Sequence, residues 1–143
     1  MRRHKALYSA GWVVALFSFN LALHAQEAGG GVKEDKPIVT IAVVPPCDPG
    51  GPEILARIAG SVKGAQKGCR IVIFVHGDVW YVQPYTAAPY TEIDSAGKWS
   101  TVTHLGTEYA ALLVCGDSRP LDKTVDLPRK GGAVFAIARV AGK

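Results

Sequence analysis

"CRIVIFVHGDVWYVQP", residues 69–84, is the stretch that decides the fold of this chain. It contains the run "RIVIFV" (70–75), which is apolar at both odd and even positions, and after Gly77 and Asp78 a second run, "VWYVQ" (79–83). Successive side chains of a strand point to opposite faces, so a short run that is apolar on both faces is typical of a strand covered on both sides. The stretch therefore predicts a central strand of a packed sheet, followed by a second strand.

Short segments that are apolar or alternating flank this stretch on both sides. Residues 53–62, "EILARIAGSV", alternate with period two, which favours a strand, although Pro52 and Gly60 also fit the ends of a helix. The other expected strands are "IVTIAVV" (38–44), "YTEI" (90–93), "KWSTVTH" (98–104), "EYAALLVC" (108–115) and "GAVFAIARV" (132–140). About seven short strands joined by Gly, Pro and Asp turns predict an all-β, immunoglobulin-like antiparallel β-sandwich, with a small barrel as the alternative.

The first 25 residues have the layout of a secretory signal peptide. "MRRHK" is a basic head, residues 6–25 are mostly apolar, and Ala25 supplies a small residue for cleavage. Leu23 stands where a second small residue is usual, so an uncleaved membrane anchor is the alternative. We expect residues 26–36 to form a flexible leader and residues 37–143 to form one domain, secreted or periplasmic.

Charge argues against nucleic acid as a partner. The chain has 16 Lys and Arg and 12 Asp and Glu, a net charge of +4. Loss of the signal peptide removes Arg2, Arg3 and Lys5 and no acid, which leaves 13 basic and 12 acidic residues and a net charge of +1. Nucleic-acid binding depends on clustered basic residues, so this balance excludes that class. No motif in the sequence indicates a cofactor.

The three cysteines, Cys47, Cys69 and Cys115, all lie in the part expected to be exported. Export permits a disulfide, and an odd number leaves at least one thiol free or paired between chains. The expected bridge joins Cys47 to Cys69, because both stand at apparent strand ends, and Cys115 is then the free thiol. Three unpaired thiols are the alternative, and the spacings match no zinc pattern.

Residues 80–114 resemble an uncharacterised domain of exported bacterial proteins. The shared marks are "WYVQP", a T-x-I before a turn, "GKW", "THLGTEYAALLV" and a closing "GGAVFAIARV", and the likeness extends over roughly residues 54–142. The resemblance implies an immunoglobulin-type β-sandwich, and some of the relatives are found in chains with carbohydrate-related modules. It supplies no catalytic residues.

Four aromatic residues, Trp80, Tyr81, Tyr85 and Tyr90, gather in residues 78–93. Alternation predicts that Trp80 and Tyr81 face opposite sides of a strand, while Pro84 makes Tyr85 part of a loop or a sheet edge. Exposed rings of this kind stack on the apolar faces of sugars. The polar side chains expected to orient such a ligand are Gln83, Thr91 and Glu92. The competing interpretation places Trp80, like Trp99, in the core.

Catalytic and metal sites have weaker support. His76, Asp78 and His104 are candidates for a metal site of two histidines and one carboxylate, but their spacing is not diagnostic. The chain has no G-x-S-x-G elbow for a hydrolase. The preferred hypothesis is an exported, noncatalytic binding module for a polysaccharide. The alternatives are a structural or interaction domain that binds a cell-envelope protein through an exposed sheet edge, and a small hydrolase or metalloenzyme.

Overall fold

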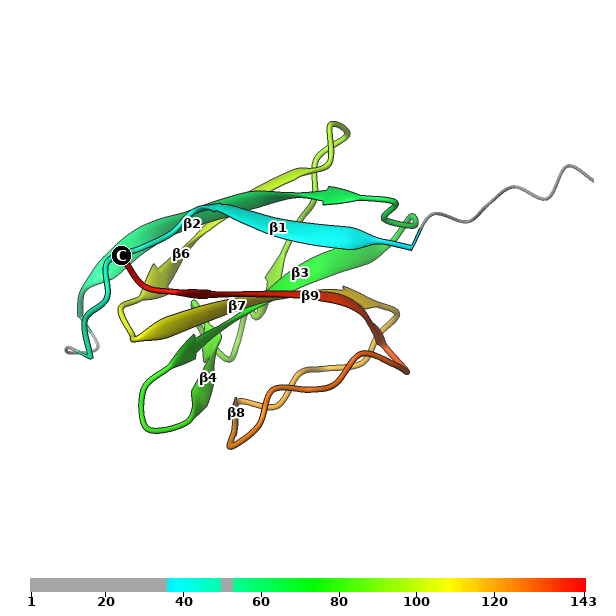
Figure 1. Ribbon diagram of the computed structural model, residues 1–143. Coiled ribbons are helices and arrows are strands. Elements are labelled where there is room, and N and C mark those ends of the chain that lie inside the picture. Colours follow the sequence, from blue (N-terminus) through cyan, green and yellow to red (C-terminus); the bar gives the residue numbers. More distant parts are fainter. Residues whose placement is uncertain (1–35, 50–52) are drawn as a thin grey trace, which may run out of the picture. The chain divides into compact units, whose positions relative to one another are not determined.

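A computed structural model describes residues 36–49 and 53–143 of the chain (Figure 1). The expected signal peptide, and the expected leader up to residue 35, lie outside the described residues. Nine strands are present in the described ranges: β1 (Ile38–Val43), β2 (Leu55–Lys63), β3 (Cys69–His76), β4 (Trp80–Gln83), β5 (Tyr90–Thr91), β6 (Lys98–His104), β7 (Glu108–Cys115), β8 (Lys123–Thr124) and β9 (Val134–Ala141). Within these ranges no helix long and apolar enough to cross a membrane is found.

The strands form two antiparallel sheets that pack face to face, β1-β2-β6 and β8-β4-β3-β7-β9, with β5 also paired to β3 (Figure 1). The predicted all-β, immunoglobulin-like sandwich is confirmed, with nine strands instead of about seven. The strand β5 lies within the expected segment 90–93 but has only two residues. The two-residue strand β8 was not predicted, because it is too short for a periodic pattern to be detected.

The segment that fitted both a strand and a helix is the strand β2. Its alternate residues Ile58 and Val62 are buried in the core between the sheets. Gly60, between them, pairs with Trp99 of β6, and a Cβ added at Gly60 would lie 1.8 Å from the Thr40 carbonyl oxygen of β1 and 2.5 Å from the indole ring. A side chain at this position would therefore clash with the backbone of β1 as well as with Trp99, so the glycine permits close packing instead of ending a helix.

The six-stranded sheet has a hydrophobic core on each of its faces. The inner core lies between the sheets and takes Ile71, Ile73 and Val75 from β3 and Tyr109, Ala111 and Leu113 from β7. The outer core takes Val72, Phe74, Trp80, Val82, Ala110, Leu112 and Val114, with Leu127 of the long 116–133 connection packed against it. Because β3 and β7 are covered on both faces, their sequences are almost continuously apolar, as the run "RIVIFV" predicted.

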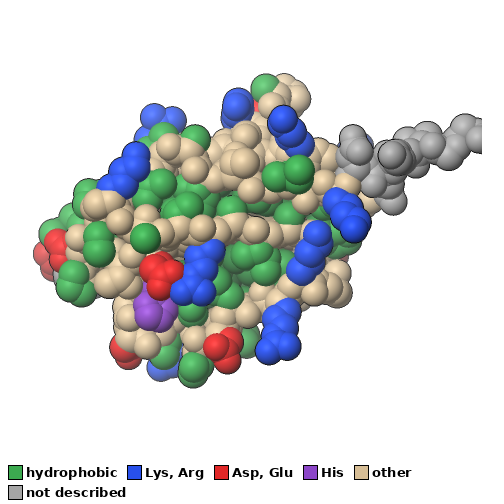
Figure 2. Space-filling model, in the orientation of Figure 1, with side chains coloured by type: hydrophobic (Ala, Val, Ile, Leu, Met, Phe, Trp, Pro, Cys, Tyr) green, Lys and Arg blue, Asp and Glu red, His purple; other side chains and the backbone are tan. Residues whose placement is uncertain are grey.

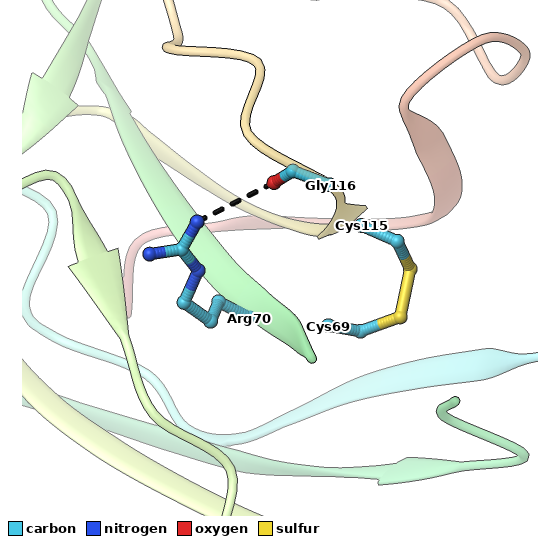
Figure 3. Close-up of a disulfide and its surroundings, with 4 residues drawn as sticks. All are labelled: Cys69, Arg70, Cys115 and Gly116. Carbon is cyan, nitrogen blue, oxygen red and sulfur yellow. Dashed lines mark hydrogen bonds between the residues drawn. A yellow bond between two sulfur atoms is a disulfide. The ribbon is translucent and has the colours of Figure 1, made fainter. Parts of the chain in front are cut away.

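The disulfide joins Cys69 to Cys115, at paired positions of β3 and β7 (Figure 3). The two Cα atoms are 4.1 Å apart, and Cys47 is an exposed free thiol. The predicted bridge between Cys47 and Cys69 is therefore wrong, as is the expectation that Cys115 is the free thiol. Cys47 lies at the end of the sandwich opposite the disulfide. Its backbone forms an isolated β-bridge with Gly106 there, and the pairing of β3 with β7 places the disulfide at the other end.

Candidate ligand-binding groove

The strand β4 divides the aromatic stretch between the two faces of its sheet. Trp80 and Val82 belong to the outer core, whereas Tyr81 packs partly against the inner core. Trp80 is only 4% exposed; the His76 ring lies 4.8 Å from it and the Arg139 guanidinium 5.1 Å from it, measured to ring centroids. The competing interpretation of Trp80 as core is therefore the one that the structure supports.

Tyr90 also lies on the outer-core side and is separated from Tyr85. It is half-buried, the Arg70 guanidinium lies 3.8 Å above its ring, and its hydroxyl donates a hydrogen bond to the Ser118 carbonyl at 2.9 Å. Arg70 in turn donates to the carbonyl of Gly116, beside the disulfide (Figure 3). Tyr90 therefore helps to hold the 116–133 connection against the sheet, and the four aromatic rings do not share one surface.

The remaining two tyrosines lie in an open groove, which we call the edge groove, where the end of β4 meets the end of β6. Its volume is about 670 Å³. Its polar lining comprises Asp78, Tyr81, Gln83, His104, Asp122 and Lys123, and its apolar walls include Pro49, Pro84, Tyr85 and Leu105. Glu92 is exposed in a different hollow, beside Arg57 and Lys98. Of the six predicted ligand-binding residues, the structure thus brings Tyr81, Gln83 and Tyr85 together.

Tyr81 and Asp78 are paired at one end of the edge groove. The Tyr81 hydroxyl donates to Asp78 Oδ1 at 2.8 Å, and the Val79 backbone N–H donates to the same oxygen at 3.0 Å. The hydrogen bond from Tyr81 lowers the pKa of the Asp78 carboxyl, and the same contact raises the pKa of the Tyr81 hydroxyl. Asp78 is therefore ionised at neutral pH, and the orientation of the Tyr81 hydroxyl is fixed.

Gln83 and His104 are paired at the other end. Gln83 Oε1 accepts from the backbone N–H of His104 at 2.9 Å and from His104 Nδ1 at 2.8 Å. Gln83 is 4% exposed, whereas Tyr85, which follows it after Pro84, is 54% exposed. The Tyr85 ring meets the His104 ring edge-on, with centroids 6.1 Å apart. An exposed aromatic ring thus stands next to the buried amide of Gln83 and the half-buried ring of His104, both oriented by hydrogen bonds, which is the composition of a small-ligand site.

The candidate metal ligands are not gathered at one point. His104 and Asp78 line the edge groove, but the His76 ring packs at a tilt against Trp80, and its Nδ1 lies 3.3 Å from the Thr107 hydroxyl. Among residues 36–49 and 53–143, no group of three His, Cys, Asp or Glu residues is placed to hold a metal ion.

Basic side chains are spread over the face shown in Figure 2, with apolar and polar side chains between them.

The fold and this site together define an immunoglobulin-like β-sandwich with an open groove at one edge. Comparisons with protein families, with curated proteins and with solved structures gave no match to this chain. The resemblance to an exported bacterial domain therefore stays a prediction. The pairings of Tyr81 with Asp78 and of Gln83 with His104 were not predicted. The second joins residues 21 positions apart on strands of different sheets, which a local pattern cannot indicate.

Proposed function

We propose that this protein is an exported, noncatalytic binding module that holds a neutral glycan in the edge groove. The observation that carries the proposal is Tyr85, whose ring is 54% exposed, meets the His104 ring edge-on and borders oriented polar groups. Stacking on an aromatic ring suits the apolar face of a pyranose, and hydrogen-bonding groups at the rim suit its hydroxyls. The groove supplies both within one open surface.

The charges of the groove favour an uncharged ligand over a polyanion. Asp78 and Asp122 contribute two carboxylates against the single ammonium group of Lys123 among the residues that line it. A sulfated or uronate-rich chain would meet an excess of negative charge, which lowers its affinity at low ionic strength.

Export is part of the same proposal. The basic head and apolar stretch of residues 1–25 support it from the sequence. The disulfide between Cys69 and Cys115 is compatible with an oxidising compartment, where such bonds persist. A glycan of the cell envelope or the surrounding medium is the ligand that an exported module would encounter.

Titration calorimetry of the mature protein with neutral hexasaccharides tests the proposal. The panel comprises the hexamers of β-1,4-glucose, of α-1,4-glucose and of β-1,4-linked N-acetylglucosamine, with hexagalacturonate as the charged comparison. We expect one neutral hexamer to bind, and Tyr85→Ala to weaken that binding about tenfold or more through loss of stacking area. Tyr90→Phe is the matched control and leaves binding unchanged, because Tyr90 lies outside the edge groove. Absence of binding by every hexamer would reject the function.

A second candidate function rests on the sheet edge at β8. Leu121 and Val125 flank this two-residue strand and are 65% and 75% exposed, and β8 stands at the end of the six-stranded sheet. Exposed apolar side chains beside an edge strand suit pairing with a strand of another protein. Light scattering tests pairing between copies of this protein. A wild-type dimer that becomes a monomer in the double variant Leu121→Ser, Val125→Ser would support such pairing. A wild-type monomer at high concentration would exclude self-pairing.

A further inference from the structure

The buried amide of Gln83 has a fixed orientation. Amide oxygen and nitrogen are assigned from the hydrogen bonds that they make, and here the partner decides between them. The backbone N–H of His104 can only donate, so the Gln83 atom 2.9 Å from it must be the oxygen. The amide nitrogen, with its two hydrogens, must therefore point away from His104.

The same oxygen fixes the tautomer of the neutral His104 ring. Gln83 Oε1 is an acceptor only, so His104 Nδ1, 2.8 Å away, must carry a hydrogen. In a neutral imidazole the other nitrogen, Nε2, is then an unprotonated acceptor. One shared oxygen thus sets both a donor, on Gln83, and an acceptor, on His104.

Neither of these two nitrogens, Gln83 Nε2 and His104 Nε2, has a protein partner in the part of the chain that the structure describes. In the same ranges, Trp99 Nε1 is the one side-chain N or O atom that is both fully buried and unpaired. The two nitrogens are therefore not fully buried, and both residues line the edge groove, although Gln83 is only 4% exposed.

We propose that the Gln83–His104 pair recognises two neighbouring hydroxyls of a neutral sugar: Gln83 Nε2 donates to one hydroxyl oxygen, and His104 Nε2 accepts from the other hydroxyl. This inference rests on the proposed function and specifies its ligand chemistry. A vicinal diol offers an acceptor oxygen and a donor O–H on adjacent atoms, which complements a donor and an acceptor held at fixed positions. Such oriented groups discriminate strongly, because a ligand that lacks one hydroxyl leaves a desolvated protein group unpaired.

Modified sugars test the donor on Gln83 and the acceptor on His104 separately. The probes are the methyl glycosides of glucose or of N-acetylglucosamine, whichever unit the hexasaccharide panel selects, each with one hydroxyl replaced by hydrogen or by fluorine. At the position that accepts from Gln83, we expect hydrogen to weaken binding about tenfold and fluorine, a weak acceptor, to restore part of it. At the neighbouring position, which donates to His104, we expect both replacements to weaken binding equally.

A variant of His104 then assigns the second position. His104→Asn keeps an amide donor within reach of Gln83 Oε1 and removes the Nε2 acceptor. We expect this variant to bind the parent glycoside about tenfold more weakly. Replacing the hydroxyl that donates to His104 should then weaken binding no further, because its partner has already been removed. His76→Asn, a histidine outside the groove, is the matched control and keeps both penalties.

The outcomes separate this inference from the function on which it rests. If a hexasaccharide binds and Tyr85→Ala abolishes binding, but no adjacent pair of hydroxyls shows this pattern, the Gln83–His104 assignment is wrong and the glycan function stands. The assignment is also wrong, with the function intact, if the penalties are equal in wild type and His104→Asn. If no glycan in the panel binds, both fail together.

Discussion

The two faces of strand β4 differ completely although they alternate residue by residue. Trp80 and Val82 point to the outer core, where the 116–133 connection closes over them. Tyr81 and Gln83 point to the opposite side and line a groove of about 670 Å³. Four consecutive residues therefore supply both a hydrophobic core and a candidate ligand site.

This difference arises from what covers each face and not from the character of the side chains. Trp80 is an amphipathic ring that would also suit a sugar-binding surface, yet it is 4% exposed, because neighbouring elements supply His76 and Arg139 around its ring. Tyr85 has no such cover and is 54% exposed. Aromatic residues in one short stretch can therefore have opposite roles, and only the elements that pack over each ring distinguish them.

The largest expected effect comes from opening the outer core. Trp80→Ala should lower the free energy of unfolding by about 3–5 kcal/mol, the usual range for truncating a buried tryptophan. Urea unfolding followed by circular dichroism measures the change. A cost below about 1 kcal/mol would mean that the outer core is not a packed core, and the contrast between the two faces would then fail.

The next effect concerns the bond that ties β3 to β7, the two strands that both cores share. Replacing Cys69 and Cys115 together by alanine should cost about 2–4 kcal/mol of stability, since the bond closes a loop with a sequence separation of 46 residues. Thermal unfolding measures the cost, and Cys47→Ser, which removes only the free thiol, is the control. Labelling of the native, oxidised protein with iodoacetamide should modify Cys47 alone; labelling of Cys115 instead would contradict the pairing.

A smaller effect is expected at the rim of the outer core, where Arg139 forms an ion pair with Glu108. The hydrogen bond from Arg139 lowers the pKa of Glu108. A lowered folded-state pKa gives stability that is present above the ordinary glutamate pKa and is lost as pH falls through the folded value. Glu108→Gln should therefore lower Tm at pH 7 by less than about 5 °C, since the pair is largely exposed. The difference from wild type should vanish in thermal scans at strongly acidic pH; a difference that grows on acidification would contradict the sign.

The smallest expected effect is at the groove. Tyr85→Ala should change the free energy of unfolding by no more than about 0.5 kcal/mol, because the ring is exposed and fills no core. The same urea experiment, run beside Trp80→Ala, gives the comparison directly. A loss above about 2 kcal/mol would show that Tyr85 is structural, and a binding defect in this variant could not then be assigned to the ligand.

Local patterns predicted the strands well and the contacts between them poorly. The double-faced apolar run of β3 and the alternation of β2 follow from the pleat, so both were identified correctly. The predicted disulfide partner of Cys69 was wrong because the end of one strand can lie next to the ends of several other strands. The antiparallel register that places Cys69 opposite Cys115 is not a local property of the sequence. Tyr90 and Glu92 were grouped with Tyr85 by proximity along the chain, but β5 pairs with β3 and directs Tyr90 to the covered face.

The sequence by itself determined that this chain builds an antiparallel sandwich, because side-chain alternation and turn residues act within a few positions along the backbone. Only the tertiary structure decided which face of β4 is sealed, which cysteines meet, and that Gln83 and His104 form one oriented pair. Each of these depends on residues that are distant in sequence and are brought together when both sheets, the connection over the outer core and the edge groove form at once.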